Sequence, residues 1–470
     1  MDATPEGSGR QAGDGAAVPA RCALGVAEIA AWRTALGSVD RDVTDAERVD
    51  QLRVLEELKS AAAAAQARIA VDLDASQRTE QARAGVPAGE RGKGVGSQVA
   101  LARRESPHRG GRLLGLAKAL VQEMPCTYAA LGRGAISEWR ATLLVRESAC
   151  LSLSDRAAFD AELAGDVAAL EGLGDRELVA RAKRVAYRLD AASVVRRARK
   201  AEEERCVTLR PAPDTMSYLT GLLPVTQGVA VLAALRKAAD AARARGDGRS
   251  DGQVMADTLV ERVTGRTAAD SVPVEVQLVI TDRALLAGDG EPAHVPGYGT
   301  VPAAWAREML ARRLGDRQAE GCTLVWLRRL FTSPTTGQLV QLDSRARTVP
   351  PGLARFIDTR DRTCRTLWCD APIRHRDHVV PAARGGPTSA ENLQGYCEAC
   401  NYVKQAPGWY TRAGPPPDGA EGHVVETVTP TGHRYRSAAQ ALPGHRGGGS
   451  ATRPGTWPRI DIYYTPPAAA

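Results

Sequence analysis

Four cysteines of this 470-residue chain lie in one short stretch, residues 364–404. They form two close pairs, Cys364 with Cys369 and Cys397 with Cys400. Each pair is close enough to form one tight turn that presents two thiolates, and four thiolates complete a tetrahedral zinc site. Such a site leaves no open position on the metal, so we expect a structural zinc that does no chemistry. Free thiols and disulfides are the alternatives.

Polar residues between and beside the cysteine pairs have the types that phosphodiester hydrolysis needs. Asp377 and Asn401 offer oxygen atoms, which Mg²⁺ and Mn²⁺ prefer as ligands. His378 directly follows Asp377, so on a strand it points to the other side and is free to act as a base. A phosphodiester stabilised by a metal and attacked by a histidine-activated water would be a complete hydrolytic site. The alternative for His378 is a packed histidine without a catalytic role.

The elements that must position these residues are short. Residues 374–380 alternate as a strand does, and a loop over 382–391 contains Gly385 and Gly386, which permit unusual backbone angles. Residues 396–401 form a knuckle that runs into a short helix, which ends at Pro407. Together these elements predict a ββα finger. At about 40 residues it is near the size at which a metal is needed for folding.

This segment resembles the HNH endonuclease motif, also called the ββα-metal motif. The resemblance is carried by residues in the order that the motif requires, namely Asp377-His378, Gly385-Gly386 with Thr388, Asn392-Leu393, Cys397-x2-Cys400-Asn401 and Lys404. It implies that His378 is the general base that activates water and that Asp377 is a ligand of a catalytic Mg²⁺ or Mn²⁺. It further implies that Asn392 fixes the loop that holds the base. Asn401 stands where the third signature residue, often His, ligates the metal.

The same resemblance gives roles to the cysteines and to two basic residues. The structural zinc ligands would be Cys364, Cys369, Cys397 and Cys400. Lys404, one helical turn beyond Cys400, would face the phosphate of a nucleic acid. Arg384 is a second residue for the same contact.

The preceding part of the chain is similar to the helical region of uncharacterised function that precedes HNH nucleases in many high-GC bacterial proteins. The stretches SPHRGGRLLGLAKALVQEMP, ISEWRATLLVRESACLS and LRPAPDTMSYLTGLLP carry this second resemblance. It implies an architecture but no activity.

Composition and periodicity agree with a mainly helical fold. Aromatic residues make up only 4% of the chain, so the core must consist mostly of Leu, Val and Ala, which favours helix-on-helix packing. Thr44 and Glu47 form a capping-box pattern before a helical run over 46–77. Residues 175–204 are predicted to form one basic helix.

These patterns divide the chain into five parts. A disordered tail is predicted at 1–20, a helical domain of unknown function at 21–265, and a small mixed α/β connector at 266–349. The zinc-containing HNH finger is placed at 350–412, and a hairpin followed by a disordered tail at 413–470. The hairpin is expected around a Thr-Pro-Thr-Gly turn at 429–432.

Charge and hydropathy restrict the partner and the location. The formal net charge is +7 and the sequence pI is about 9.0, which suits a polyanion such as DNA, although a mildly basic protein without nucleic acid is the alternative. No stretch approaches the roughly 18 consecutive apolar residues of a membrane span. We expect a soluble, cytoplasmic protein with no membrane partner.

The sequence thus predicts a metal-dependent HNH endonuclease that hydrolyses phosphodiester bonds in DNA. One ββα unit cuts one strand, so cutting both strands would take a homodimer or two binding events. The alternatives are a zinc-knuckle nucleic-acid-binding or regulatory protein with weak or no nuclease activity, and an adaptor whose nuclease acts only when a partner docks.

Overall fold

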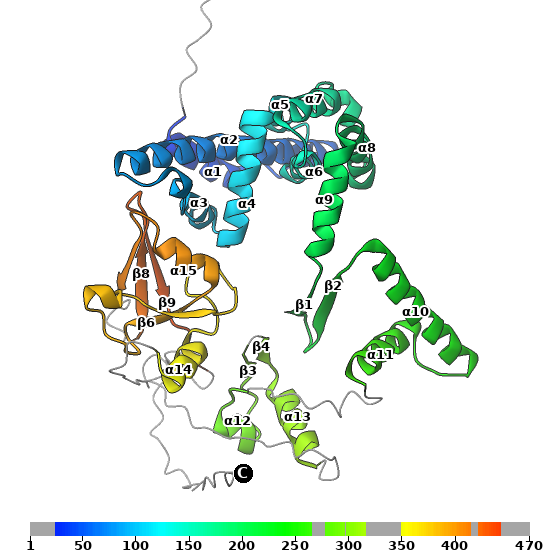
Figure 1. The fold of residues 1–470 in the computed structure, drawn as a ribbon, viewed down its shortest axis with the longest axis vertical. Coiled ribbons are helices and arrows are strands. Elements are labelled where there is room, and N and C mark those ends of the chain that lie inside the picture. Colours follow the sequence, from blue (N-terminus) through cyan, green and yellow to red (C-terminus); the bar gives the residue numbers. More distant parts are fainter. Residues whose placement is uncertain (1–23, 266–277, 297, 316–348, 415–421, 443–470) are drawn as a thin grey trace, which may run out of the picture. The chain divides into compact units, whose positions relative to one another are not determined.

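The computed structural model describes residues 24–265, 278–296, 298–315, 349–414 and 422–442 (Figure 1). The predicted tail at 1–20, much of the connector, and the predicted terminal tail beyond 442 lie outside these ranges. The described residues are mainly helical and carry four small antiparallel sheets, which confirms the predicted fold class. None of the described helices has the length and apolar character needed to cross a membrane.

The chain divides after Lys59 into two compact units. The first contains α1 (Val26–Ala35), η1 (Leu36–Ser38) and the beginning of α2 (Asp45–Arg83). The predicted capping box is present, since the Thr44 amide donates to Glu47 Oε2 at 2.9 Å and the Glu47 amide donates to Thr44 Oγ1 at 3.3 Å. These two bonds satisfy amides that the first turn of a helix leaves unpaired.

The second unit begins with a helical part built on an aliphatic core. Its elements are the rest of α2, η2 (Ala88–Glu90), α3 (Val95–Arg103), α4 (Pro107–Lys118), the π-helical η3 (Ala119–Glu123), α5 (Pro125–Gly132), α6 (Glu138–Ser148), α7 (Leu153–Ala164), η4 (Val167–Leu170), α8 (Asp175–Leu189) and α9 (Ala191–Glu203). Leu120, Leu131, Leu144 and Phe159 are fully buried in its largest cluster. The buried members of this cluster are mostly Leu and Ala, which agrees with the low aromatic content of the chain.

Glycines allow α3 and α4 to pack closely. A Cβ on Gly110 would lie 2.3 Å from the carbonyl oxygen of Gly96, so no larger residue fits at this crossing without moving a helix. Gly110 lies in one of the stretches that carry the second resemblance.

The prediction of one helix over 175–204 is wrong. The chain leaves the helix at Asp190, and α9 starts there anew. Asp190 Oδ1 accepts a hydrogen bond from the Ser193 amide at 2.9 Å, which is an N-cap that competes with a continuous helix. The basic residues of this segment are therefore shared between two helices.

Small elements follow before the finger. The hairpin of β1 (Cys206–Pro211) and β2 (Ser217–Leu222) leads to α10 (Val225–Ala244) and α11 (Asp251–Thr264). The described part of the connector contains α12 (Asp282–Leu286), β3 (Ala293–Val295), β4 (Gly299–Val301) and α13 (Ala303–Gly315). It is thus a mixture of helix and strand.

The C-terminal part is a ββα finger joined to a three-stranded sheet. After α14 (Pro351–Asp361), β5 (His375–His378) pairs with β6 (Leu393–Tyr396), with η6 (Ala382–Arg384) in the loop between them, and α15 (Glu398–Lys404) follows. Then β7 (Tyr410–Ala413), β8 (Val424–Val428) and β9 (Arg434–Ala438) form a sheet in the order β7-β8-β9. The pairing of β8 with β9 confirms the predicted hairpin.

This sheet belongs with the finger. Thr411 Oγ1 on β7 donates to the Val379 carbonyl at 2.7 Å, and Arg365 Nη2 donates to the Ser437 carbonyl on β9 at 2.6 Å. The predicted domain end at 412 falls within β7. Sequence spacing alone does not show which strands pair, so it could not include this sheet.

Candidate metal and catalytic centre

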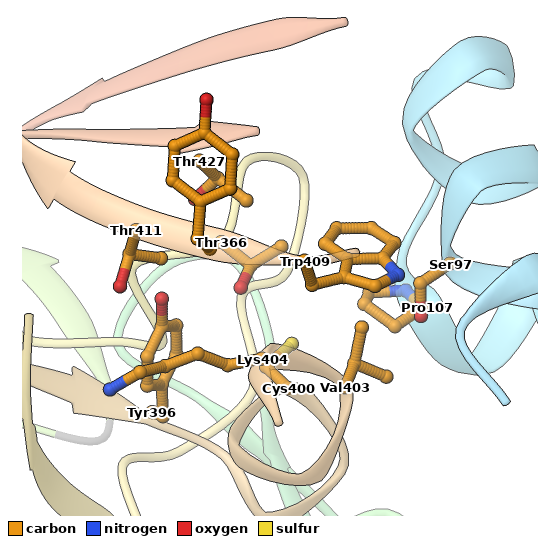
Figure 2. Close-up of a pocket in the computed structure, with 11 residues that line it drawn as sticks. Ser97, Pro107, Thr366, Tyr396, Cys400, Val403, Lys404, Trp409, Thr411 and Thr427 are labelled. Atoms are coloured by element: carbon orange, nitrogen blue, oxygen red, sulfur yellow. The ribbon is translucent and has the colours of Figure 1, made fainter. Parts of the chain in front are cut away.

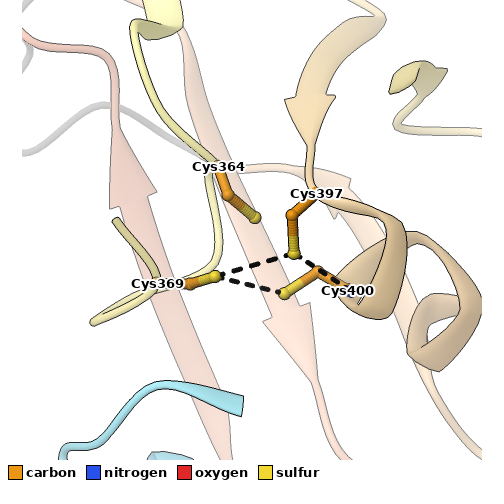
Figure 3. Close-up of side chains that lie close together, drawn as sticks. All are labelled: Cys364, Cys369, Cys397 and Cys400. Carbon is orange, nitrogen blue, oxygen red and sulfur yellow. Dashed lines mark hydrogen bonds between the residues drawn. The ribbon is translucent and has the colours of Figure 1, made fainter. Parts of the chain in front are cut away.

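The two cysteine pairs converge on one point (Figure 3). The Sγ atoms of all four lie within 4.8 Å of one another, and each cysteine is buried. Cys369 Sγ lies 3.7 Å from both Cys397 Sγ and Cys400 Sγ. A tetrahedron with Zn–S bonds of about 2.3 Å has S–S edges of about 3.8 Å, whereas a disulfide has about 2.05 Å. The geometry therefore fits four zinc thiolates.

The turns that hold the cysteines come from different elements. Cys397 is the N-cap of α15, and the Cys400 amide donates to its sulfur at 3.5 Å. The Cys364 amide donates to the Ala371 carbonyl at 2.9 Å, which closes the first knuckle. Hydrogen bonds with Cys364 and then Cys369 hold the pKa of the Cys397 thiol below its ordinary value. The same contacts raise the pKa of the Cys369 and Cys400 thiols, so the fit to zinc rests on the sulfur geometry.

Asp377 lies on β5 under the helix α15. The Lys404 ammonium contacts both the Asp377 carboxylate and the His378 carbonyl oxygen. The Lys404 side chain is only 8% exposed. The sequence predicts Lys404 to face phosphate, whereas in the structure its charge is held by oxygen atoms of β5.

Two side-chain amides on the neighbouring elements α15 and β6 have buried polar atoms. Asn401 is three residues before Lys404 and so on the same helical face, and its Oδ1 is buried without a hydrogen-bond partner among the described residues. Gln394 is the cross-strand neighbour of Asp377, is fully buried, and has no partner for either amide atom within the described ranges. Buried polar atoms are nearly always satisfied, so the unpaired Asn401 oxygen is able to accept a ligand. The oxygens of Asp377 and Asn401 suit a hard divalent cation.

His378 is held from the loop that follows β5. Its Nε2 lies 3.0 Å from Thr388 Oγ1. Burial, together with the positive charge of Lys404, lowers the pKa of His378, and the Asp377 carboxylate opposes this shift. The neutral imidazole, which is the form that accepts a proton, is therefore the major form near neutral pH.

Asn392 closes this loop with three hydrogen bonds. Its Oδ1 accepts from the Val380 amide at 2.8 Å, and its Nδ2 donates to the carbonyls of Val380 at 3.0 Å and Pro387 at 2.8 Å. The glycine pair makes room for it. Gly385 has φ +82°, and a Cβ on Gly386 would lie 1.9 Å from the Val380 carbonyl oxygen.

Arg384 lies apart from these contacts. It ends η6 on the same loop and is exposed. The structure therefore pairs Lys404 with Asp377, places Asn401 three residues before Lys404 on α15, and leaves Arg384 at the surface.

Two protein-family models match the chain. The model for a domain of unknown function, DUF222, matches residues 44–361, which is more than half of the chain. The chain belongs to the DUF222 family. A model for HNH endonucleases matches residues 364–406, so an HNH endonuclease domain follows the DUF222 region, as the two resemblances predict. No curated protein and no solved structure matches the chain.

The HNH domain borders a small cavity (Figure 2). Ser97 and Pro107 line it together with residues of the finger that include Tyr396, Lys404 and Trp409. Its volume of about 20 Å³ is room for about one water molecule. It is too small for a nucleotide.

Sequence reasoning missed several partners in the HNH domain. Thr388 belongs to the motif but no role follows from the motif for it, and Gln394 has no motif signal. Only the strand register of the structure reveals Gln394, because it places this residue opposite Asp377. The Lys404–Asp377 pair spans 27 residues, and its only sequence signal is the position of Lys404 one turn after Asn401.

Proposed function

We propose that this protein is a metal-dependent endonuclease that hydrolyses phosphodiester bonds in DNA. The observation that carries the proposal is the environment of His378, a half-buried histidine fixed at Nε2 by Thr388 beside the Asp377 carboxylate. It lies within a matched HNH endonuclease domain. A purely structural zinc knuckle needs neither this histidine nor the orphaned oxygen of Asn401.

His378 is the general base of the proposed reaction. If Nε2 carries the proton and donates it to Thr388 Oγ1, Nδ1 presents its lone pair and takes a proton from the attacking water. The lowered pKa of the imidazole keeps this lone pair available near neutral pH. Asn392 acts through the loop and is a positioning residue.

Asp377 and Asn401 are the residues that would hold the catalytic Mg²⁺ or Mn²⁺. When bound, the metal stabilises the charge that develops on the scissile phosphate. Lys404 now neutralises Asp377, so a cation at Asp377 would release the ammonium. The freed ammonium would then be near a bound phosphate, and the exposed Arg384 offers a second phosphate contact.

The four cysteines hold the structural zinc in this proposal. They fix the turn before β5 to the start of α15, so both sides of the catalytic centre depend on the metal.

Plasmid nicking with Mg²⁺ or Mn²⁺ tests the catalytic assignment. His378→Ala should lower the rate by about 100-fold or more, the usual contribution of a general base. The matched control is His375→Ala on the same strand, which should cut at close to the wild-type rate. Both variants must retain zinc, so that a loss of rate is not a loss of fold. Equal cleavage by wild type and His378→Ala would refute the proposal.

A further inference from the structure

One face of the β7-β8-β9 sheet carries three arginines around one glutamate. Arg412 on β7, Glu426 on β8 and Arg436 on β9 form a single cross-strand row. Arg434 is two residues from Arg436 on the same strand, so it lies on the same face. All three arginine side chains extend over Glu426, whose side chain is only 1% exposed.

The glutamate holds the guanidinium groups in place. Arg412 Nε donates to Glu426 Oε2 at 2.6 Å, Arg436 Nε donates to Oε1 at 3.3 Å, and Arg434 Nη1 lies 3.7 Å from Oε2. The hydrogen bond from Arg412, and then that from Arg436, holds the pKa of the Glu426 carboxyl below its ordinary value. Glu426 therefore stays ionised, and the group of four carries a formal charge of +2.

The positive charge on this face exceeds what the fold itself uses. Among the described residues, Glu426 is the one acidic side chain within ion-pair distance of the three arginines. Their side chains remain 47%, 57% and 59% exposed. A guanidinium has five donors in a fixed plane, so each arginine can hold Glu426 and still present donors to an outside anion.

The opposite face of the sheet is fixed to the nuclease strand. Thr411, the neighbour of Arg412 on β7, donates to the carbonyl of Val379, which directly follows His378. Successive residues of a strand point to opposite faces, so Arg412 faces away from the finger and toward solvent. The arginine face therefore has a fixed place relative to the catalytic strand.

We propose that Arg412, Arg434 and Arg436 bind the phosphate backbone of the DNA on which the HNH domain acts, beside rather than at the scissile bond. This inference rests on the proposed nuclease function for its ligand. Guanidinium groups are the preferred partners of phosphate oxygens. Arginines already ordered by Glu426 lose less side-chain freedom when DNA binds.

The test is the salt dependence of DNA binding by the full-length protein. The probe is a fluorescent 20-base-pair duplex, measured by anisotropy without divalent metal and in a His378→Ala background, so that no cleavage interferes. In the variant R412Q/R434Q/R436Q, the slope of log K against log salt should fall by about 0.9 for each phosphate that the protein no longer neutralises, or by about 2 to 3 in total. The matched control is R48Q/R53Q/R68Q on α2, whose arginines are likewise exposed and paired with acidic residues. It should keep the wild-type slope.

A second variant controls for misfolding, because the triple substitution leaves Glu426 without its ion-pair partners and could unfold the sheet. Glu426→Gln removes the opposing charge and keeps the arginines, so it should bind DNA more tightly at low salt. A purely structural role for the cluster predicts a lower melting temperature and no gain in binding.

Three results would overturn the inference. The first is a wild-type salt slope in R412Q/R434Q/R436Q, and the second is an equal drop in slope for the α2 control. The third is that R412Q/R434Q/R436Q loses binding to an acidic peptide while its DNA binding is unchanged, which would indicate a protein partner. Failure of the nuclease proposal looks different, since the wild type would then fail to nick a plasmid while its DNA binding still depends on these arginines.

Discussion

Asn392→Ala tests whether the HNH loop is held by one side chain. The amide of Asn392 makes three hydrogen bonds to backbone atoms of Val380 and Pro387, and the residue is 8% exposed. Each such bond contributes about 1 kcal/mol net, so their loss should lower the free energy of local opening by about 3 kcal/mol. With a tenfold change for each 1.4 kcal/mol, the opening constant should rise by about 100-fold.

Amide hydrogen exchange at Val380 measures this opening. Its N–H donates to Asn392 Oδ1 at 2.8 Å and should exchange about 100-fold faster in Asn392→Ala, while amides of α5 and α6 stay unchanged. The nicking rate should fall as the loop opens, because the same loop carries Thr388, which holds His378. Zinc content should not change.

Two variants at or beside this position separate its hydrogen bonds. Asn392→Asp keeps the shape and the acceptor for Val380, but a carboxylate cannot donate to the two carbonyls, so it should also open the loop. Ser389→Ala removes one longer hydrogen bond, of 3.3 Å, that the backbone N–H of Asn392 donates to Ser389 Oγ. It should raise the exchange rate at Val380 by less than about fivefold. If Val380 exchange in a folded Asn392→Ala protein stays within about threefold of wild type, the reasoning is refuted.

Two other predictions concern stability. Cys400→Ser, or removal of zinc by a chelator, should unfold the finger, because metal binding supplies roughly 10 kcal/mol or more to such sites. Metal analysis and circular dichroism check this, and Cys206→Ser, at an exposed cysteine, should keep the zinc. Burial, aided by the charge of Arg360, lowers the pKa of His423 to about 3, so the folded protein favours the neutral imidazole. An unfolded histidine titrates near 6.5, so stability should be full above about pH 6.5 and fall as the pH drops toward 3. Thermal denaturation across this range should show a flatter fall in His423→Gln, and an equal fall in both proteins would contradict the assignment.

The sequence predicted the parts of the site that are local in the chain. The cysteine spacings and the order of Asp377, His378, Asn392 and Asn401 are sufficient to predict a ββα finger, because each element is short and its turns carry their own signals. The fold class follows from helical periodicity for the same reason.

The parts that depend on strand register or on long-range packing could not be predicted. The row of Arg412, Glu426 and Arg436 exists only because three strands pair in one register. The break at Asp190 was missed because a single side-chain cap outweighed a helical pattern on both sides. The contact of Lys404 with Asp377 was missed because the position of Lys404 on the helix does not show which carboxylate lies opposite.

The residues at the end of α14 show that the HNH finger does not begin where the HNH family match does. Arg360, within the DUF222 match, is 2% exposed; it donates to the Ala390 carbonyl and to the Leu393 carbonyl, the latter at 2.7 Å. Asp361 Oδ2 accepts from the Gly395 amide at 2.7 Å.

These contacts hold the chain on both sides of Asn392. The four-cysteine cluster joins one end of the finger to α15, Asn392 fixes the loop, and Arg360 with Asp361 fixes β6. All of these devices bind backbone or cysteine sulfur, and none of them uses His378, Asp377 or Asn401. The finger can therefore hold its shape while these three side chains remain available for a metal and a water, which is the division of roles that a hydrolytic site requires.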